Sequence, residues 1–87
     1  MREHEEVNNM TRPIYEIAAE IRRDWAKPNY AAVPYLDAMS SLNSANDAYY
    51  ADDARTVILY FLSNAQSWKG DTARRVKAEL KALVKRA

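Results

Sequence analysis

Cysteine is absent from the 87 residues, and glycine and histidine occur once each. Without cysteine, stability must come from packing rather than from disulfides, and nothing points to an oxidising compartment. A chain with one glycine has no glycine-rich loop that could cradle a phosphate. No apolar run approaches the roughly 20 residues of a membrane-spanning helix, and the polar start is no signal peptide. We therefore expect a cytoplasmic protein with no membrane partner.

Residues with catalytic or metal-binding chemistry are equally sparse. The one histidine, His4, lies in a polar segment, although a general base must be held in place by its neighbours. Serines are present, but no histidine is placed to activate them. Asp47, Asp52 and Asp53 lack the glycine and terminal glutamate of a calcium loop, and no His/Cys cluster suits zinc. The sequence predicts no enzyme, no metal site and no cofactor.

Length and composition favour one folded domain. Hydrophobic residues make up 48% of the chain, which is ordinary for a globular protein and too high for a disordered one. Residues 1–10 carry little that could pack, so we expect a flexible N-terminal segment followed by a single helical domain over residues 11–87. Met10 is an alternative start residue.

Two helices are expected in the first half of the domain. The first runs from about Thr11, a plausible N-cap, to Lys27, and Pro28 ends it. The second spans roughly residues 34–43 and begins at a proline, with turn-forming residues after it. The helical spacing of apolar residues in the first predicts a buried stripe of Ile14, Ile17, Ala18, Ile21 and Trp25.

A third helix is expected at the hydrophobic centre of the chain. Its start is open, either after a cap at Asp52 or near Asp47. A helical stripe continues to Trp68, which is too long for a typical strand. Further apolar residues widen this stripe, so we expect the helix to be covered on more than one side. The stripe consists of Ala54, Val57, Ile58, Phe61, Ala65 and Trp68, and the residues that widen it are Leu59, Tyr60 and Leu62.

A fourth helix is expected after a short bend. Gly70 is suited to close the third helix, and Asp71 to cap the fourth. The bend then has the length of a helix-turn-helix turn. Ala73, Val76, Leu80, Leu83 and Ala87 form a narrow apolar stripe. The predicted fold is all-α, a compact bundle of three to four helices with helix three central, helices one and four packed on it and helix two closing one side.

Charge is divided unevenly along the chain. Residues 1–53 hold five Lys/Arg and ten Asp/Glu, a net of −5, whereas residues 54–87 hold eight and two, a net of +6. Either the two parts compensate within the fold or one surface serves an anionic partner. The candidate anion or nucleic-acid contacts are Arg74, Arg75, Lys77, Lys81 and Lys85.

The basic fourth helix has two interpretations. Lysines at every fourth residue line one ridge that could neutralise phosphates. Against sequence-specific binding, the base-reading residues Asn, Gln and Ser are absent from this helix. Lysines late in a helix are also favoured by its dipole, with no partner required.

Six tyrosines are many for a chain of this length. Those in or beside loops, Tyr30, Tyr49 and Tyr50, form a candidate protein interface, because tyrosine often anchors such contacts. The alternative is that tyrosines fill a small core and direct their hydroxyls to water.

The blocks "EIAAEIRRDW", "AVPYLDAMSSL" and "ARTVILYFLSNAQSWKGDTARRVKAEL" give the chain a resemblance to a family. It resembles small helical proteins without assigned function from plasmids, prophages and genomes of Gram-positive bacteria. The resemblance covers roughly Ile14 to Leu83 and implies a context, that of a phage or mobile-element accessory protein, but no reaction, cofactor or binding residue.

The function predicted from the sequence is a non-catalytic protein-protein interaction module that acts on a host protein. The alternative is a DNA-binding protein that uses the basic C-terminal helix in a helix-turn-helix-like way. A homodimer that buries helix one or helix four against its copy is a further alternative, since small helical chains often complete their core this way.

Overall fold

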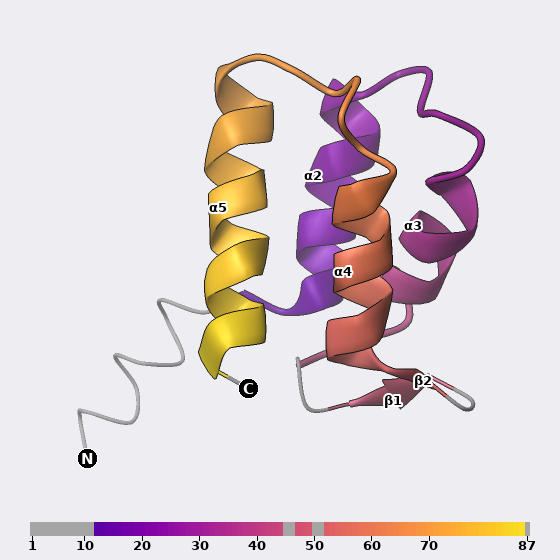
Figure 1. Ribbon diagram of the computed structural model, residues 1–87, viewed down its shortest axis with the longest axis vertical. Coiled ribbons are helices and arrows are strands. Elements are labelled where there is room, and N and C mark those ends of the chain that lie inside the picture. The colour runs from indigo at the N-terminus through magenta and orange to yellow at the C-terminus, as the bar shows by residue number, and fades with distance from the viewer. Residues whose placement is uncertain (1–11, 45–46, 50–51, 87) are drawn as a thin grey trace.

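The computed structural model describes residues 12–44, 47–49 and 52–86, and these confirm the all-α prediction (Figure 1). The described part contains four helices and one hairpin whose two strands have two residues each. The N-terminal segment that was expected to be flexible, residues 1–10, lies outside the described residues, as does Ala87 of the predicted stripe. The elements are α2 (Ile14–Asp24), α3 (Val33–Met39), β1 (Ala48–Tyr49), β2 (Asp52–Asp53), α4 (Ala54–Ser63) and α5 (Asp71–Arg86).

α2 begins directly after Pro13, whose extended backbone turns the chain into the helix. The backbone N–H of Ile14 donates to the carbonyl of Asn43, and that of Tyr15 to the carbonyl of Leu42, each at 2.9 Å. These bonds satisfy two of the donors that the first turn of a helix leaves free. The helix ends at Asp24, before the predicted Lys27. Four residues of its predicted stripe are buried, namely Ile14, Ile17, Ala18 and Ile21. The fifth, Trp25, lies just past the end of the helix and is only partly buried.

Neither predicted start of the third helix is correct. Asp53, rather than Asp52 or a residue near Asp47, is the N-cap of α4, and its carboxylate accepts a hydrogen bond from the N–H of Thr56 at 2.9 Å. The antiparallel pairing of β1 with β2 places the chain for this cap. The carbonyl of Asp47 accepts from the N–H of Ala54 at 2.8 Å, which attaches the loop to the start of the helix.

α4 also ends earlier than its apolar stripe predicted. The helix stops at Ser63, and residues 64–70 form a connection to α5. Ala65 and Trp68 are buried as expected, but they belong to this connection. Gly70 therefore does not close α4. It precedes α5 with a φ of +111°, a backbone angle that side-chain-bearing residues rarely adopt.

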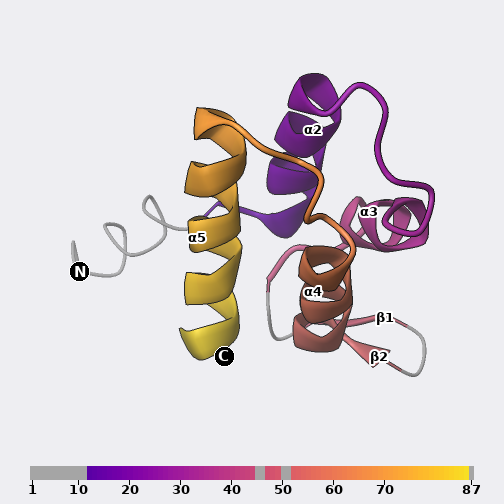
Figure 2. The ribbon, with the colours of Figure 1, turned by 45° about the horizontal axis from the view of Figure 1, so that its top comes forward.

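The four helices enclose one apolar core (Figures 1 and 2). In both views α5 and α3 lie at opposite sides, with α2 and α4 between them. α4 packs against α3 and α5, and α2 packs against the same two helices. Phe61 of α4 is the largest fully buried side chain. The predicted fourth helix, α5, packs on the predicted third, α4, as expected, but the predicted first helix does not, because α2 lies mainly against α3 and α5.

An aromatic cluster seals the end of the bundle where α2 and α4 finish and α5 begins. The rings of Trp25 and Trp68 are stacked, with centroids 5.8 Å apart and planes 12° apart. Phe61 meets both rings edge-on, at 6.3 and 6.4 Å. The indole N–H of Trp68 donates to a carboxylate oxygen of Asp24 at 2.8 Å. This cluster fixes the connection between α4 and α5 against the rest of the fold.

Candidate functional site

The surface of α5 follows from its narrow buried stripe. Four apolar side chains face the core, and the remaining positions divide into two flanks and an outer face, because a helix turns 3.6 residues per turn. The buried residues are Ala73, Val76, Leu80 and Leu83. Arg75 and Glu79 lie on the flank that faces α2. We call the opposite ridge, Lys77, Lys81 and Lys85, the lysine flank.

The flank that faces α2 is neutralised within the chain. Arg75 forms an ion pair with Glu20 of α2. Arg12 binds Glu79 through two parallel hydrogen bonds, Nε to Oε2 at 3.0 Å and Nη2 to Oε1 at 2.7 Å. Such two-point contacts are the strongest arginine-carboxylate geometry. Arg75 and Glu79 have the i,i+4 spacing of a helical ion pair, but each residue pairs instead with a residue outside α5.

Glu20 joins these two pairs into one network. Its Oε1 lies 2.8 Å from Nη2 of Arg12, as an ion pair without hydrogen-bond geometry. Its side chain is only 18% exposed. The hydrogen bond from Arg75, followed by the contact with Arg12, lowers the pKa of Glu20 despite the opposing effect of burial. The hydrogen bonds that Arg12 donates to Glu79, together with the nearby negative charge of Glu20, raise the pKa of Arg12 despite the opposing effect of burial, so the network is fully charged.

The lysine flank shows the opposite situation. Lys81 and Lys85 are exposed, and neither has an ion pair or hydrogen bond within the described residues. Arg74, one turn before Lys77, pairs with Asp71 of its own helix, but both side chains are largely exposed, at 75% and 94%. Exposed pairs of this kind are weak. Within the part of the chain that the structure describes, the positive charge of this ridge is therefore mostly unmatched.

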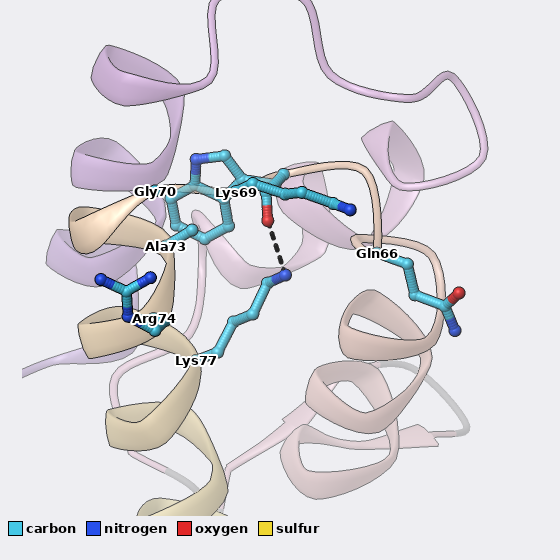
Figure 3. Close-up of a pocket in the computed structure, with 7 residues that line it drawn as sticks. Gln66, Lys69, Gly70, Ala73, Arg74 and Lys77 are labelled. Carbon is cyan, nitrogen blue, oxygen red and sulfur yellow. Dashed lines mark hydrogen bonds between the residues drawn. The ribbon is translucent and has the colours of Figure 1, made fainter.

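A shallow hollow of about 240 Å³ lies at the upper end of the lysine flank (Figure 3). Lys77 reaches from α5 to the carbonyl oxygen of Trp68, to which its amine donates at 2.7 Å. The same amine lies 5.8 Å from the centre of the Trp68 ring. Lys69 extends across the hollow, whereas the guanidinium of Arg74 points away from these amines. Gln66, Gly70 and Ala73 complete the lining.

Lys77 is the least solvated cation of this group. Burial lowers the pKa of Lys77, and the neighbouring charges of Lys69 and Lys81 lower it further. Like charges this close raise the cost of holding each ammonium ion. A bound anion would relieve that repulsion, so the hollow and the ridge below it favour negative partners.

The five predicted anion contacts thus separate into three groups. Arg75 is used by the fold, through Glu20. Lys81 and Lys85 are free within the described residues, whereas Lys77 and Arg74 have partners nearby. The predicted helix-turn-helix bend is wrong, because residues 64–70 separate α4 from α5, more than the three or four residues of that motif.

Tyr30 and Tyr49, two of the three predicted interface tyrosines, lie near opposite ends of α4. Tyr30 is 87% exposed in the loop before α3. The preceding residue, Asn29, donates to the carbonyl of Asn64 at 3.2 Å, which holds this loop beside the C-terminal end of α4. Tyr49 belongs to β1, at the N-terminal end of α4, about 15 Å away along a ten-residue helix. Its side chain and the whole of Tyr50 lie outside the described residues.

The structure shows an apolar surface that the sequence analysis did not predict. Leu59 and Tyr60 are each 49% exposed on the outer side of α4, so the prediction that these residues are covered is wrong. The ring of Tyr35 from α3 packs against Tyr60, with centroids 5.4 Å apart. We call Tyr35, Leu59 and Tyr60 the aromatic face. One sign of it was present in the sequence: both α4 residues lie off the stripe that points to the core.

Comparison of the chain with family models, with curated proteins and with solved structures gave no match. The resemblance to small proteins of mobile elements therefore stays a prediction. Within the described residues, no group of three or more His, Cys, Asp or Glu side chains is arranged to hold a metal ion. No helix in that same part of the chain is long and apolar enough to cross a membrane.

Proposed function

We propose that the protein is a non-catalytic protein-binding module and that the aromatic face is its contact surface. One observation carries this proposal. Of the large hydrophobic side chains in the described residues, four are about half exposed or more, and two of them, Leu59 and Tyr60, are neighbours on one helix. Exposed apolar side chains gathered on the outer side of a small protein are typical of an interaction site.

The composition of the aromatic face supports the same function. Tyrosine contributes a rigid apolar ring and a hydroxyl that can donate or accept, which is why it anchors many interfaces. The ring of Tyr35 restrains Tyr60 before any partner arrives, so less side-chain freedom is lost on binding. Tyr30, held beside the C-terminal end of α4, lies where it can extend this surface.

The resemblance to proteins of phages and other mobile elements adds a biological setting to the proposal. A module from such an element would act on a protein of the host cell. Tyr49 and Tyr50 stay predicted contacts.

The test is affinity purification from a lysate of the native host, treated with nuclease, with the bound proteins identified by mass spectrometry. The variant Leu59→Gln/Tyr60→Gln removes the apolar character of the face while keeping good helix formers. We expect it to lose the specific partner. Tyr15→Gln is the matched control, because Tyr15 is equally exposed, at 48%, but lies on α2. Retention of the partner by the folded double variant would refute this surface.

A further inference from the structure

We propose that the lysine flank of α5 is a second binding surface, which contacts the phosphate backbone of duplex nucleic acid without reading its sequence. This inference is independent of the aromatic face and rests on different residues. Its basis is the contrast between a neutralised and an unmatched side of the same helix.

Charge complementarity is the first argument. On the flank that faces α2, Glu20 neutralises Arg75, and Glu79 of α5 is itself paired with Arg12. In the described residues, no carboxylate pairs with Lys69, Lys81 or Lys85. Cations left unmatched by the fold attract an anionic partner and speed its arrival.

Geometry is the second argument. Lys77, Lys81 and Lys85 follow one another at four-residue intervals, so they rise about 6 Å at each step and line one ridge. Phosphates of one DNA strand advance about 3.4 Å along the duplex axis, and long lysine side chains can adjust to that spacing. Lys69 and Arg74 lie near the N-terminal end of the ridge, where they line the hollow. A linear row of cations suits a linear row of phosphates.

Side-chain chemistry favours nucleic acid over an acidic protein. Ala78 and Ala82 on the outer face of α5 are exposed and small, so the ridge offers no large apolar anchor beside its lysines. Protein interfaces use such anchors and are depleted in lysine. α5 also lacks Asn, Gln and Ser, three of the residues that read base edges, and this favours binding that is independent of sequence.

The experiment is fluorescence anisotropy with a labelled mixed-sequence duplex of about 20 base pairs, titrated at salt concentrations from about 50 to 200 mM. Lys77 is not counted, because its amine already donates to the carbonyl of Trp68. Four contacts, from Lys69, Arg74, Lys81 and Lys85, predict a slope of log K against log salt near −3.6, at about −0.9 per phosphate neutralised. The affinity would then fall on the order of 100-fold over this range. A duplex of unrelated sequence should bind equally well.

Two double variants locate the surface. Lys81→Gln/Lys85→Gln should weaken binding and reduce the magnitude of the slope by about 2, because two phosphate contacts are lost. Arg23→Gln/Lys27→Gln is the control, since it removes the same charge from exposed residues of α2 and the loop after it. The control should keep the original slope. Far-UV circular dichroism verifies that both variants are folded.

Three results would overturn the proposal. The first is no binding to the duplex at the lowest salt concentration. The second is an unchanged slope for the folded Lys81→Gln/Lys85→Gln variant. The third is preferential binding of poly-glutamate over the duplex, which would assign the lysine flank to an acidic protein instead.

Discussion

The two flanks of α5 both carry charged side chains, but only the flank that faces α2 has its charges paired across the fold. Toward α2, Arg75 and Glu79 are held by Glu20 and Arg12, in contacts that are partly shielded from water. On the lysine flank, Lys81 and Lys85 extend into solvent without partners in the described part of the chain. The difference teaches that the net charge of a helix does not reveal its binding capacity. What matters is which charges the fold has already neutralised.

The largest effect is expected where the lysine flank joins the core. Trp68→Ala removes the stacked ring, its edge contacts with Phe61 and its bond to Asp24, and should cost about 3–5 kcal/mol of unfolding free energy. Because small domains have little stability to lose, this variant should be largely unfolded. Urea denaturation followed by circular dichroism measures the loss.

Trp68→Phe is the companion variant, since it keeps an aromatic ring but lacks the indole N–H. It should remain folded with a smaller loss. If Trp68→Ala proves nearly as stable as the original chain, the upper end of the lysine flank is not fixed by the aromatic cluster, and the contrast between the flanks weakens.

An intermediate effect is expected on the neutralised flank. Glu20→Gln leaves Arg12 and Arg75 without their shared carboxylate, and we expect a loss of about 1–2 kcal/mol, as for a partly buried charged hydrogen bond. Glu16→Gln is the control, because Glu16 is exposed on the same helix and should change the unfolding free energy by no more than about 0.5 kcal/mol.

The contribution of Glu20 should also depend on pH. Its pKa is lowered in the folded state, so its stabilisation is complete above the ordinary value of 4.5 and is lost as pH falls through the lowered folded value. The difference in unfolding free energy between the original chain and Glu20→Gln should therefore be largest near neutral pH and shrink in acid. An equal difference at both would show that the charge of Glu20 is not what stabilises this flank.

The smallest effect on stability is expected on the lysine flank. Lys81→Gln/Lys85→Gln should change the unfolding free energy by no more than about 0.5 kcal/mol, because neither amine contacts the described fold. Thermal unfolding measures this directly. A loss of more than about 1 kcal/mol would mean that the flank has partners within its own chain, and the two sides of α5 would no longer differ in kind.

The sequence predicted the inward faces of the helices well. The described residues of the stripes within α2 and α5 are buried as predicted. This prediction succeeds because the spacing of apolar residues shows which side of a helix meets the core. The same periodicity misled at the end of α4. Ala65 and Trp68 continue the spacing of a helix, yet they reach the core from the connection after it. Burial selects apolar residues in a loop as readily as in a helix.

The candidate surfaces were less predictable, because they depend on contacts between distant parts of the chain. Arg75 and Glu79 have the spacing of an i,i+4 pair, but Glu20 and Arg12 compete for them from outside the helix. Which lysines stay unmatched can be read only after such pairings are known. Leu59 and Tyr60 were predicted to be covered because the sequence shows that they are hydrophobic. It does not show that no other helix covers the outer side of α4 in the described structure.

The stacking of Trp25 on Trp68 gives the protein an internal optical reporter. The chain contains two tryptophans, and both belong to this one contact, so intrinsic fluorescence and near-ultraviolet circular dichroism arise chiefly from a single junction. That junction joins the end of α2 to the connection that precedes α5. Because the amine of Lys77 also lies over the Trp68 ring, ligands that reach the hollow would change its emission. Unfolding and ligand binding can both be followed on the unlabelled protein.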